Sequence, residues 1–141
     1  MKKNNTKLIH WILVLISGAI LLATSCDDKY RNDWFGKWQL RSIDTGSQSI
    51  TVDSVYFNFQ TDLFMYQILL PSADTTYNYY GVNVIEGDSI HLILENKPGV
   101  NNLFWKVSGW KDKEHTYAIK KMESKELILS DENGTYNFRK F

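Results

Sequence analysis

Apolar residues alternate with polar residues at every second position along much of this chain, and this period of two constrains the fold more than any other feature. Val55, Phe57 and Phe59 alternate with Tyr56 and Asn58, and the same spacing returns in the next segment. Because successive side chains of a β-strand point to opposite faces, the pattern is typical of strands with one buried side. Aromatic residues, which favour strands, make up 14% of the chain. The sequence therefore predicts an all-β protein.

The alternating runs predict eight short strands separated by turn-forming residues. We expect these strands at residues 36–43, 55–59, 64–70, 76–85, 90–94, 115–122, 127–129 and 136–138. Most of the connections are short enough for tight turns, so neighbouring strands would form antiparallel hairpins. Such an up-and-down meander closes into a small barrel whose interior holds side chains or one small ligand. An open sandwich of the same strands is the alternative.

The first 25 residues have the three parts of a secretory signal. Lys2, Lys3 and Lys7 form a positive start, an apolar run follows over residues 8–23, and small residues precede Cys26. The segment resembles bacterial lipoprotein signals, in which the cysteine takes a lipid and becomes the new N-terminus. This resemblance implies lipid on Cys26 and a stable membrane anchor. The competing interpretation is a retained transmembrane helix, although 16 apolar residues are short for a membrane span.

The domain organisation follows from this signal. We expect a signal peptide at 1–25, a lipidated tether at 26–34 and one barrel domain at 35–141. The chain has 16 basic and 16 acidic residues, and because three lysines fall in the signal, 13 basic residues face 16 acidic ones afterwards. This balance argues against nucleic acid as a partner. We expect the protein in the cell envelope, lipid-anchored, at the outer membrane.

Gly36 and Trp38 open the first predicted strand with a Gly-x-Trp motif, and Arg139 lies at the end of the last strand. With the signal and the meander, these residues make the whole chain similar to the lipocalin-like lipoproteins of Gram-negative bacteria. The resemblance implies an antiparallel eight-stranded up-and-down barrel of the lipocalin (calycin) type. It also implies that Trp38 closes one end of the barrel and that the Arg139 guanidinium stacks on its ring, a cation–π contact of about 0.5–2 kcal/mol.

The longest connection between predicted strands, residues 96–113, is a candidate binding segment. Leu103, Val107 and Trp110 are spaced as on one face of a short helix, which we expect to lie across a barrel mouth. Trp105 and Trp110 would then form a stacking platform for sugar rings or a lid over an apolar ligand. Alternatively, the aromatic residues of this segment plug the barrel end.

Two hypotheses on function follow. In the first, the anchored barrel binds a small apolar or amphipathic molecule, and its interior is incompletely filled. The candidate ligand-binding residues are Phe64, Tyr66, Tyr79, Phe104, Trp105 and Trp110. In the second, a filled barrel is an accessory module that binds a protein or a glycan through residues 96–113. The volume of the interior separates the two hypotheses.

Signals for catalysis, metals and cofactors are weak. His91 and His115 are the histidines that follow the signal, and neither is paired with another ligand at zinc spacing. We find no phosphate-binding loop and no nucleophile elbow. We therefore expect no enzyme, no metal and no cofactor. The expected partners are the membrane, through Cys26, and a small hydrophobic ligand or a glycan, with the protein partner left open.

Overall fold

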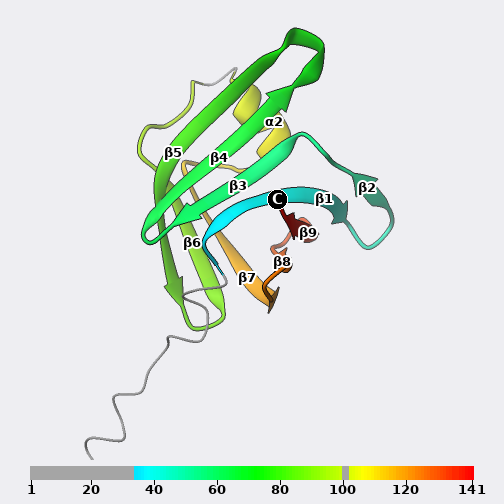
Figure 1. The fold of residues 1–141 in the computed structure, drawn as a ribbon, viewed down its shortest axis with the longest axis vertical. Helices are drawn as coiled ribbons and strands as arrows, with labels where there is room; N and C mark the ends of the chain where they lie inside the picture. The colour runs from blue at the N-terminus through cyan, green and yellow to red at the C-terminus, as the bar shows by residue number, and fades with distance from the viewer. Residues whose placement is uncertain (1–33, 100–101) are drawn as a thin grey trace, which may run out of the picture.

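The computed structural model, which describes residues 34–99 and 102–141, has nine antiparallel strands, eight of which form a barrel (Figure 1). The strands are β1 (Gly36–Asp44), β2 (Ser49–Thr51), β3 (Val55–Gln60), β4 (Leu63–Leu70), β5 (Thr75–Glu86), β6 (Ser89–Leu94), β7 (Glu114–Met122), β8 (Glu126–Ser130) and β9 (Thr135–Lys140). A 3₁₀ turn, η1 (Pro71–Ala73), joins β4 to β5, and helix α2 (Leu103–Ser108) lies between β6 and β7. The prediction of an all-β fold is confirmed.

Strand β1 closes the barrel because it pairs on both of its sides. Trp38 lies opposite Phe57 of β3 on one side and opposite Lys140 of β9 on the other. The eight strands β1 and β3–β9 therefore form the closed antiparallel barrel, and the open sandwich is excluded. Strand β2 is an additional short strand that pairs with the far end of β1. It was not predicted, because its three residues are all exposed and carry no alternation of buried and exposed side chains.

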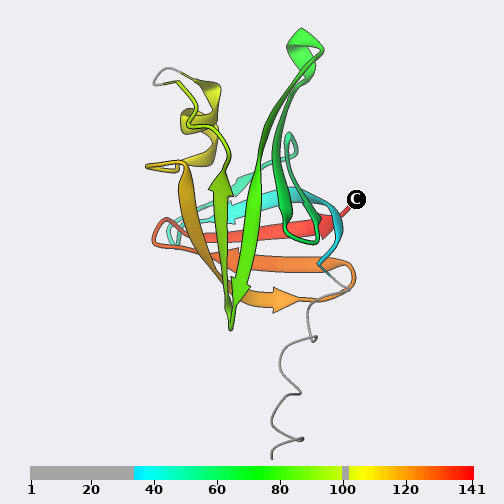
Figure 2. The ribbon, with the colours of Figure 1, turned by 90° about the vertical axis from the view of Figure 1, so that its left-hand side faces the viewer.

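The two ends of the barrel carry different parts of the chain. The described chain enters at the end that also holds the β3–β4, β5–β6 and β7–β8 turns (Figure 1), where the Trp34 ring packs on that of Phe59 near the end of β3. Helix α2 lies at the opposite end, as does the tip of the β4–β5 hairpin, which projects beyond the barrel (Figure 2). We call these the Trp34 end and the α2 end.

Buried inward-pointing side chains from every barrel strand except β5 form one hydrophobic core, and the partly buried Tyr79 and Ile85 of β5 pack against it. Along β4, for example, Phe64, Tyr66 and Ile68 are buried while their neighbours are more exposed, as the period of two predicts. The core also takes Trp34 from the entering chain and Phe104 and Trp110 from the α2 segment. Segments outside the strands thus complete the packing at both ends.

Candidate functional site

Aromatic rings inside the barrel pack against one another. The Phe57 ring lies with its centroid 5.3 Å from that of Phe64, 5.0 Å from that of Tyr66 and 4.8 Å from that of Phe138. All four side chains are almost completely buried. Ring separations of this size are ordinary contacts between packed aromatic residues. Phe64 and Tyr66, predicted to line a ligand cavity, therefore contact other rings of the core.

Phe104 fills the α2 end of the barrel. Its side chain is fully buried, and its ring centroid lies 5.0 Å from that of Tyr66 and 5.2 Å from that of Trp110. The Tyr79 ring, supplied by β5, lies 4.8 Å away on another side. Phe104 and Trp110 therefore occupy the position of a plug.

Hydrogen bonds from side chains hold α2 in place. The side-chain oxygen of Asn102, at the helix N-cap, accepts hydrogen bonds from the backbone N–H of Phe104, at 2.9 Å, and from the Tyr79 hydroxyl. The indole N–H of Trp105 donates to the carbonyl of Gly99 at 2.9 Å. The indole N–H of Trp105 is thus bonded within its own loop and the ring is partly buried, and the role of its face as a stacking platform stays a prediction.

The short helix across the barrel mouth was predicted, but the predicted buried face is wrong. Phe104 and Ser108 are the buried residues of α2, whereas Leu103 and Val107 are only partly buried. The helix ends at Gly109, which has a left-handed backbone with φ of 70°. The chain changes direction there, so Trp110 is buried from a position beyond the helix and does not extend its face.

A polar network lies beside Trp110, and sequence reasoning did not find it. The Trp110 indole N–H donates to the Tyr117 hydroxyl at 2.8 Å, and its ring stacks on that of His115 at 5.0 Å. His115 Nε2 lies 2.8 Å from a carboxylate oxygen of Asp131, and the same oxygen accepts a hydrogen bond from the Tyr136 hydroxyl. Each of these polar groups has a partner within the network, which suits a structural role.

Burial keeps the interior tyrosines uncharged. It raises the pKa of the Tyr66 hydroxyl, with smaller contributions from Tyr136 and Tyr79, and it raises that of Tyr117 in the same way. Burial also raises the pKa of Tyr136, and the neighbouring Asp131 carboxylate adds to the shift. The interior therefore holds neutral hydroxyls at physiological pH.

Two tryptophans close the Trp34 end. The Trp38 indole N–H donates to the carbonyl of Trp34 at 2.9 Å, and the Trp34 ring lies 3.8 Å from that of Phe59. The predicted partner of Trp38 is wrong: the cation over its ring is the Lys140 ammonium, at 5.1 Å. Since Phe138 points inward, the next residue, Arg139, points outward and is exposed.

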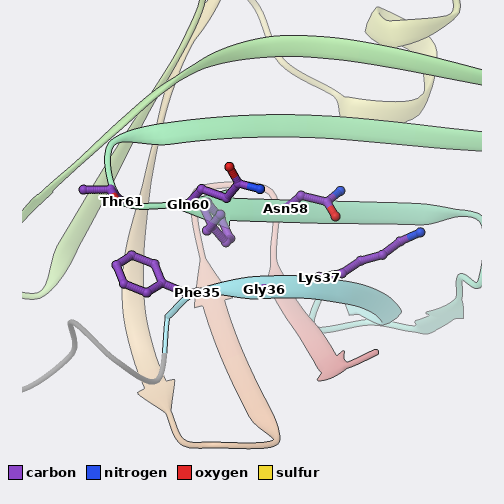
Figure 3. Close-up of a pocket in the computed structure, with 7 residues that line it drawn as sticks. Phe35, Gly36, Lys37, Asn58, Gln60 and Thr61 are labelled. Atoms are coloured by element: carbon purple, nitrogen blue, oxygen red, sulfur yellow. The ribbon is translucent and has the colours of Figure 1, made fainter.

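Three hollows lined by described residues open on the outside of the barrel. The largest, of about 380 Å³, lies between the start of β1 and the end of β3, with Phe35 near one side and the amides of Asn58 and Gln60 near another (Figure 3). The other two, of about 260 and 250 Å³, lie along β6 and β7 and at the α2 end of β7. Among the buried core residues, Phe59 lines the first of these hollows and Leu92 the second.

An apolar patch covers part of the outer surface, and it too was missed in the sequence. Leu63 is 59% exposed, Tyr80 57%, Val84 43% and Val82 40%. Leu63 lies opposite Val82 in the sheet register, and the partly buried Met65 and Ile93 lie opposite Tyr80 and Val82, so the side chains are contiguous. We call these six residues the β4–β6 patch. Every residue from 82 to 85 except Asn83 is apolar, so the sequence does not show which of these side chains point outward.

Comparison with known proteins places the chain in a family. The fold and its aromatic interior define a small closed up-and-down β-barrel. The chain belongs to the lipocalin-like domain family, whose model matches residues 20–141. Among curated proteins no match was found.

Two solved structures from Bacteroides are similar to this chain. A lipocalin-like protein from Bacteroides uniformis is 32% identical with a TM-score of 0.70, and the match covers 77% of this chain and 99% of that one. An uncharacterized protein from Bacteroides eggerthii is 26% identical with a TM-score of 0.69 and the same coverage. The predicted resemblance to lipocalin-like domains is thereby confirmed, and its lipoprotein part stays a prediction.

Several predictions concern features that the structure does not describe. Cys26 and the predicted signal lie outside the described residues. Within residues 34–99 and 102–141, no helix is long and apolar enough to cross a bilayer, and no three His, Cys, Asp or Glu side chains are grouped so that they could hold a metal ion. Lipidation and location remain predictions.

Proposed function

We propose that the protein is a lipid-anchored binding module of a bacterial cell envelope that contacts a protein partner through the β4–β6 patch. The packed interior carries this proposal, because rings that fill the barrel leave the outer surface as the place for recognition. A contiguous apolar surface is a common feature of protein interfaces. This proposal keeps the accessory-module hypothesis and moves its binding surface from residues 96–113 to the outside of β4, β5 and β6.

The anchor is the second part of the proposal. Lipid on Cys26 would hold the Trp34 end near the membrane, since Trp34 lies eight positions after Cys26 and this length of chain spans at most about 29 Å when extended. Replacing Cys26 with alanine in the full chain should abolish incorporation of labelled palmitate and release the protein from the outer membrane fraction. Unchanged labelling and fractionation of Cys26→Ala would contradict the anchor.

Site-specific photocrosslinking in cells tests the patch. A photoreactive residue at Val82, in the centre of the β4–β6 patch, should give a discrete crosslinked product with a partner protein. The control position is Lys120, which is exposed on β7, away from the patch. Adding Val84→Lys should weaken the product at Val82. The same crosslinked products from both positions, or none from Val82, would count against the patch as a binding surface.

A carrier function is the second candidate, and the placement of Phe104 favours it. This ring belongs to a six-residue helix and not to a barrel strand, so moving α2 would expose Tyr66 and the interior without breaking the sheet. Binding of a small apolar molecule would then require α2 to move outward. An apolar fluorescent probe separates the candidates: a packed wild-type barrel should bind it weakly, while Phe104→Ala, which opens an apolar space, should bind it more tightly.

A further inference from the structure

Part of strand β5 has a neighbouring strand on one side only. Strand β4 pairs with β5 from Thr75 to Val82, whereas β6 pairs with it only from Gly81 onward. The backbone N–H of Glu95 donates to the carbonyl of Tyr80 at 2.8 Å, which marks where the chain after β6 leaves β5. Among the described residues, the segment 75–79 therefore has a free edge, which we call the β5 edge (Figure 1).

The backbone groups that face this edge can be identified. Since the Tyr80 carbonyl faces Glu95, the alternate residues Thr76 and Asn78 face the same side. Their N–H and C=O groups have no backbone partner among the described residues. The side chains of Gln67 and Asn78 form a hydrogen bond of 3.0 Å, as expected for opposite residues that are not hydrogen-bonded through their backbones. The backbone groups of Asn78 therefore point away from β4, toward the β5 edge.

The β5 edge lacks the features that usually protect a free edge. Residues 75–80 read Thr-Thr-Tyr-Asn-Tyr-Tyr, with no charged residue and no proline, and tyrosine and threonine favour strands. Tyr77, in the middle of the edge, is 41% exposed. The tip of the hairpin that carries the segment projects beyond the barrel, so another chain can approach it there (Figure 2), while Tyr79 at the other end of the segment packs on Phe104 of α2. By comparison, strand β2 has only three residues.

We propose that the β5 edge pairs antiparallel with the β5 edge of a second copy of this chain. In the register centred on Tyr77, Thr76 of each copy lies opposite Asn78 of the other, and each of these two pairs can exchange two backbone hydrogen bonds. Tyr77 of one copy lies opposite Tyr77 of the other in a non-hydrogen-bonded pair, in which the side chains are close and aromatic residues interact favourably. Because the same residues serve on both sides, the pairing has two-fold symmetry.

The position of Glu95 limits the possible registers. Glu95 already lies beside Tyr80, so a second strand cannot be centred further along β5. An edge of five residues buries less surface than the roughly 1,000 Å² of a stable interface, so the pair is weak in dilute solution. A shared membrane raises the local concentration of copies and favours it. The β5 edge is distinct from the β4–β6 patch, so either proposal can fail without the other.

A disulfide crosslink tests the pairing directly. The full chain carrying Tyr77→Cys, produced in an oxidising cell envelope, should form a disulfide-linked dimer on a non-reducing gel, because closely paired positions bring the two thiols within bonding reach. Tyr80→Cys is the matched control: it is also an exposed tyrosine of β5, but Glu95 lies beside it. Wild-type protein controls for Cys26. No dimer from Tyr77→Cys, or equal dimer from both variants, would overturn the proposal.

Charge substitution gives an independent readout. Two differently tagged full-length chains that both carry Tyr77→Lys should co-purify about tenfold less than wild-type chains, because like charges face each other at the two-fold axis. Pairing Tyr77→Lys with Tyr77→Glu should restore co-purification, which also shows that both variants fold. Recovery no greater for the mixed pair than for the lysine pair would contradict the proposed register.

Discussion

The two ends of the barrel are closed by different means. At the Trp34 end, Trp38 belongs to barrel strand β1 and its indole N–H is bonded to the backbone of Trp34, four residues earlier. At the α2 end, Phe104 belongs to a separate six-residue helix that Asn102 and Tyr79 hold through side-chain hydrogen bonds. One closure is part of the sheet, and the other is attached to it. The α2 end is therefore the place where the barrel can open with the smaller loss of structure.

The largest effect is expected at the Trp34 end. Trp38→Ala removes a fully buried ring and its hydrogen bond to Trp34, so it should lower the free energy of unfolding by about 3–5 kcal/mol. Urea unfolding followed by circular dichroism measures this. Arg139→Gln serves as the control and should change stability by no more than about 0.5 kcal/mol, because its side chain is exposed. A similar loss in both variants would restore the stacking role predicted for Arg139.

At the α2 end, Phe104→Ala should cost less than Trp38→Ala, about 2–4 kcal/mol, because a short helix can settle partly into the space. The same urea titration compares the two variants. Hydrogen exchange should show faster exchange confined to α2 and its neighbours in Phe104→Ala. Equal exchange increases at both ends would remove the distinction between the two closures.

Removing single tyrosine hydroxyls at the α2 end separates the contribution of a hydrogen bond to stability from that of ring packing. Tyr117→Phe leaves the buried indole N–H of Trp110 without its partner, so it should lower the free energy of unfolding by about 1–3 kcal/mol. Tyr136→Phe removes another buried hydroxyl, but its acceptor Asp131 keeps His115 as a hydrogen-bond partner, so a smaller loss is expected. Comparison of the two variants by urea unfolding isolates the hydrogen bond. Equal losses would assign the effect to packing alone.

Alkali should destabilise the fold through the buried tyrosines. Burial raises the pKa of Tyr66 and Tyr117 above the ordinary value of about 10, so the folded protein keeps protons that the unfolded chain releases. The free energy of unfolding is unaffected by these groups below about pH 10. It falls as the pH rises above that value, by up to about 1.4 kcal/mol per pH unit for each tyrosine. Urea unfolding between about pH 9 and 11 measures this slope. Tyr66→Phe should reduce it, and an unchanged slope in this variant would contradict the role of its burial.

Much of the barrel could be predicted because its strands follow local alternation. The eight predicted strands match β1 and β3–β9, and Trp38 lies at a barrel end as the resemblance implied. Which basic side chain lies over the Trp38 ring depends on which residues point inward at the end of β9. The buried Phe138 places Lys140, and not Arg139, on the inner side of the strand.

Other features depend on distances between residues far apart in the sequence. His115 and Asp131 lie 16 positions apart, and the pairing of β7 with β8 brings them together. Whether the aromatic side chains fill the interior is equally hidden, because alternation shows which residues point inward but not how much space they leave. Tyr79 and Phe104 were both predicted as ligand-binding residues, and the structure brings them together as parts of a plug.

Native mass spectrometry on protein taken gently from its own membrane, with the acylated N-terminus removed by proteolysis before Trp34, tests the packed interior most directly. The mass is compared before and after denaturation. A packed barrel predicts the mass of the bare polypeptide in both states. A reproducible additional mass of a few hundred daltons that is lost on unfolding would contradict it and would identify the barrel as a carrier.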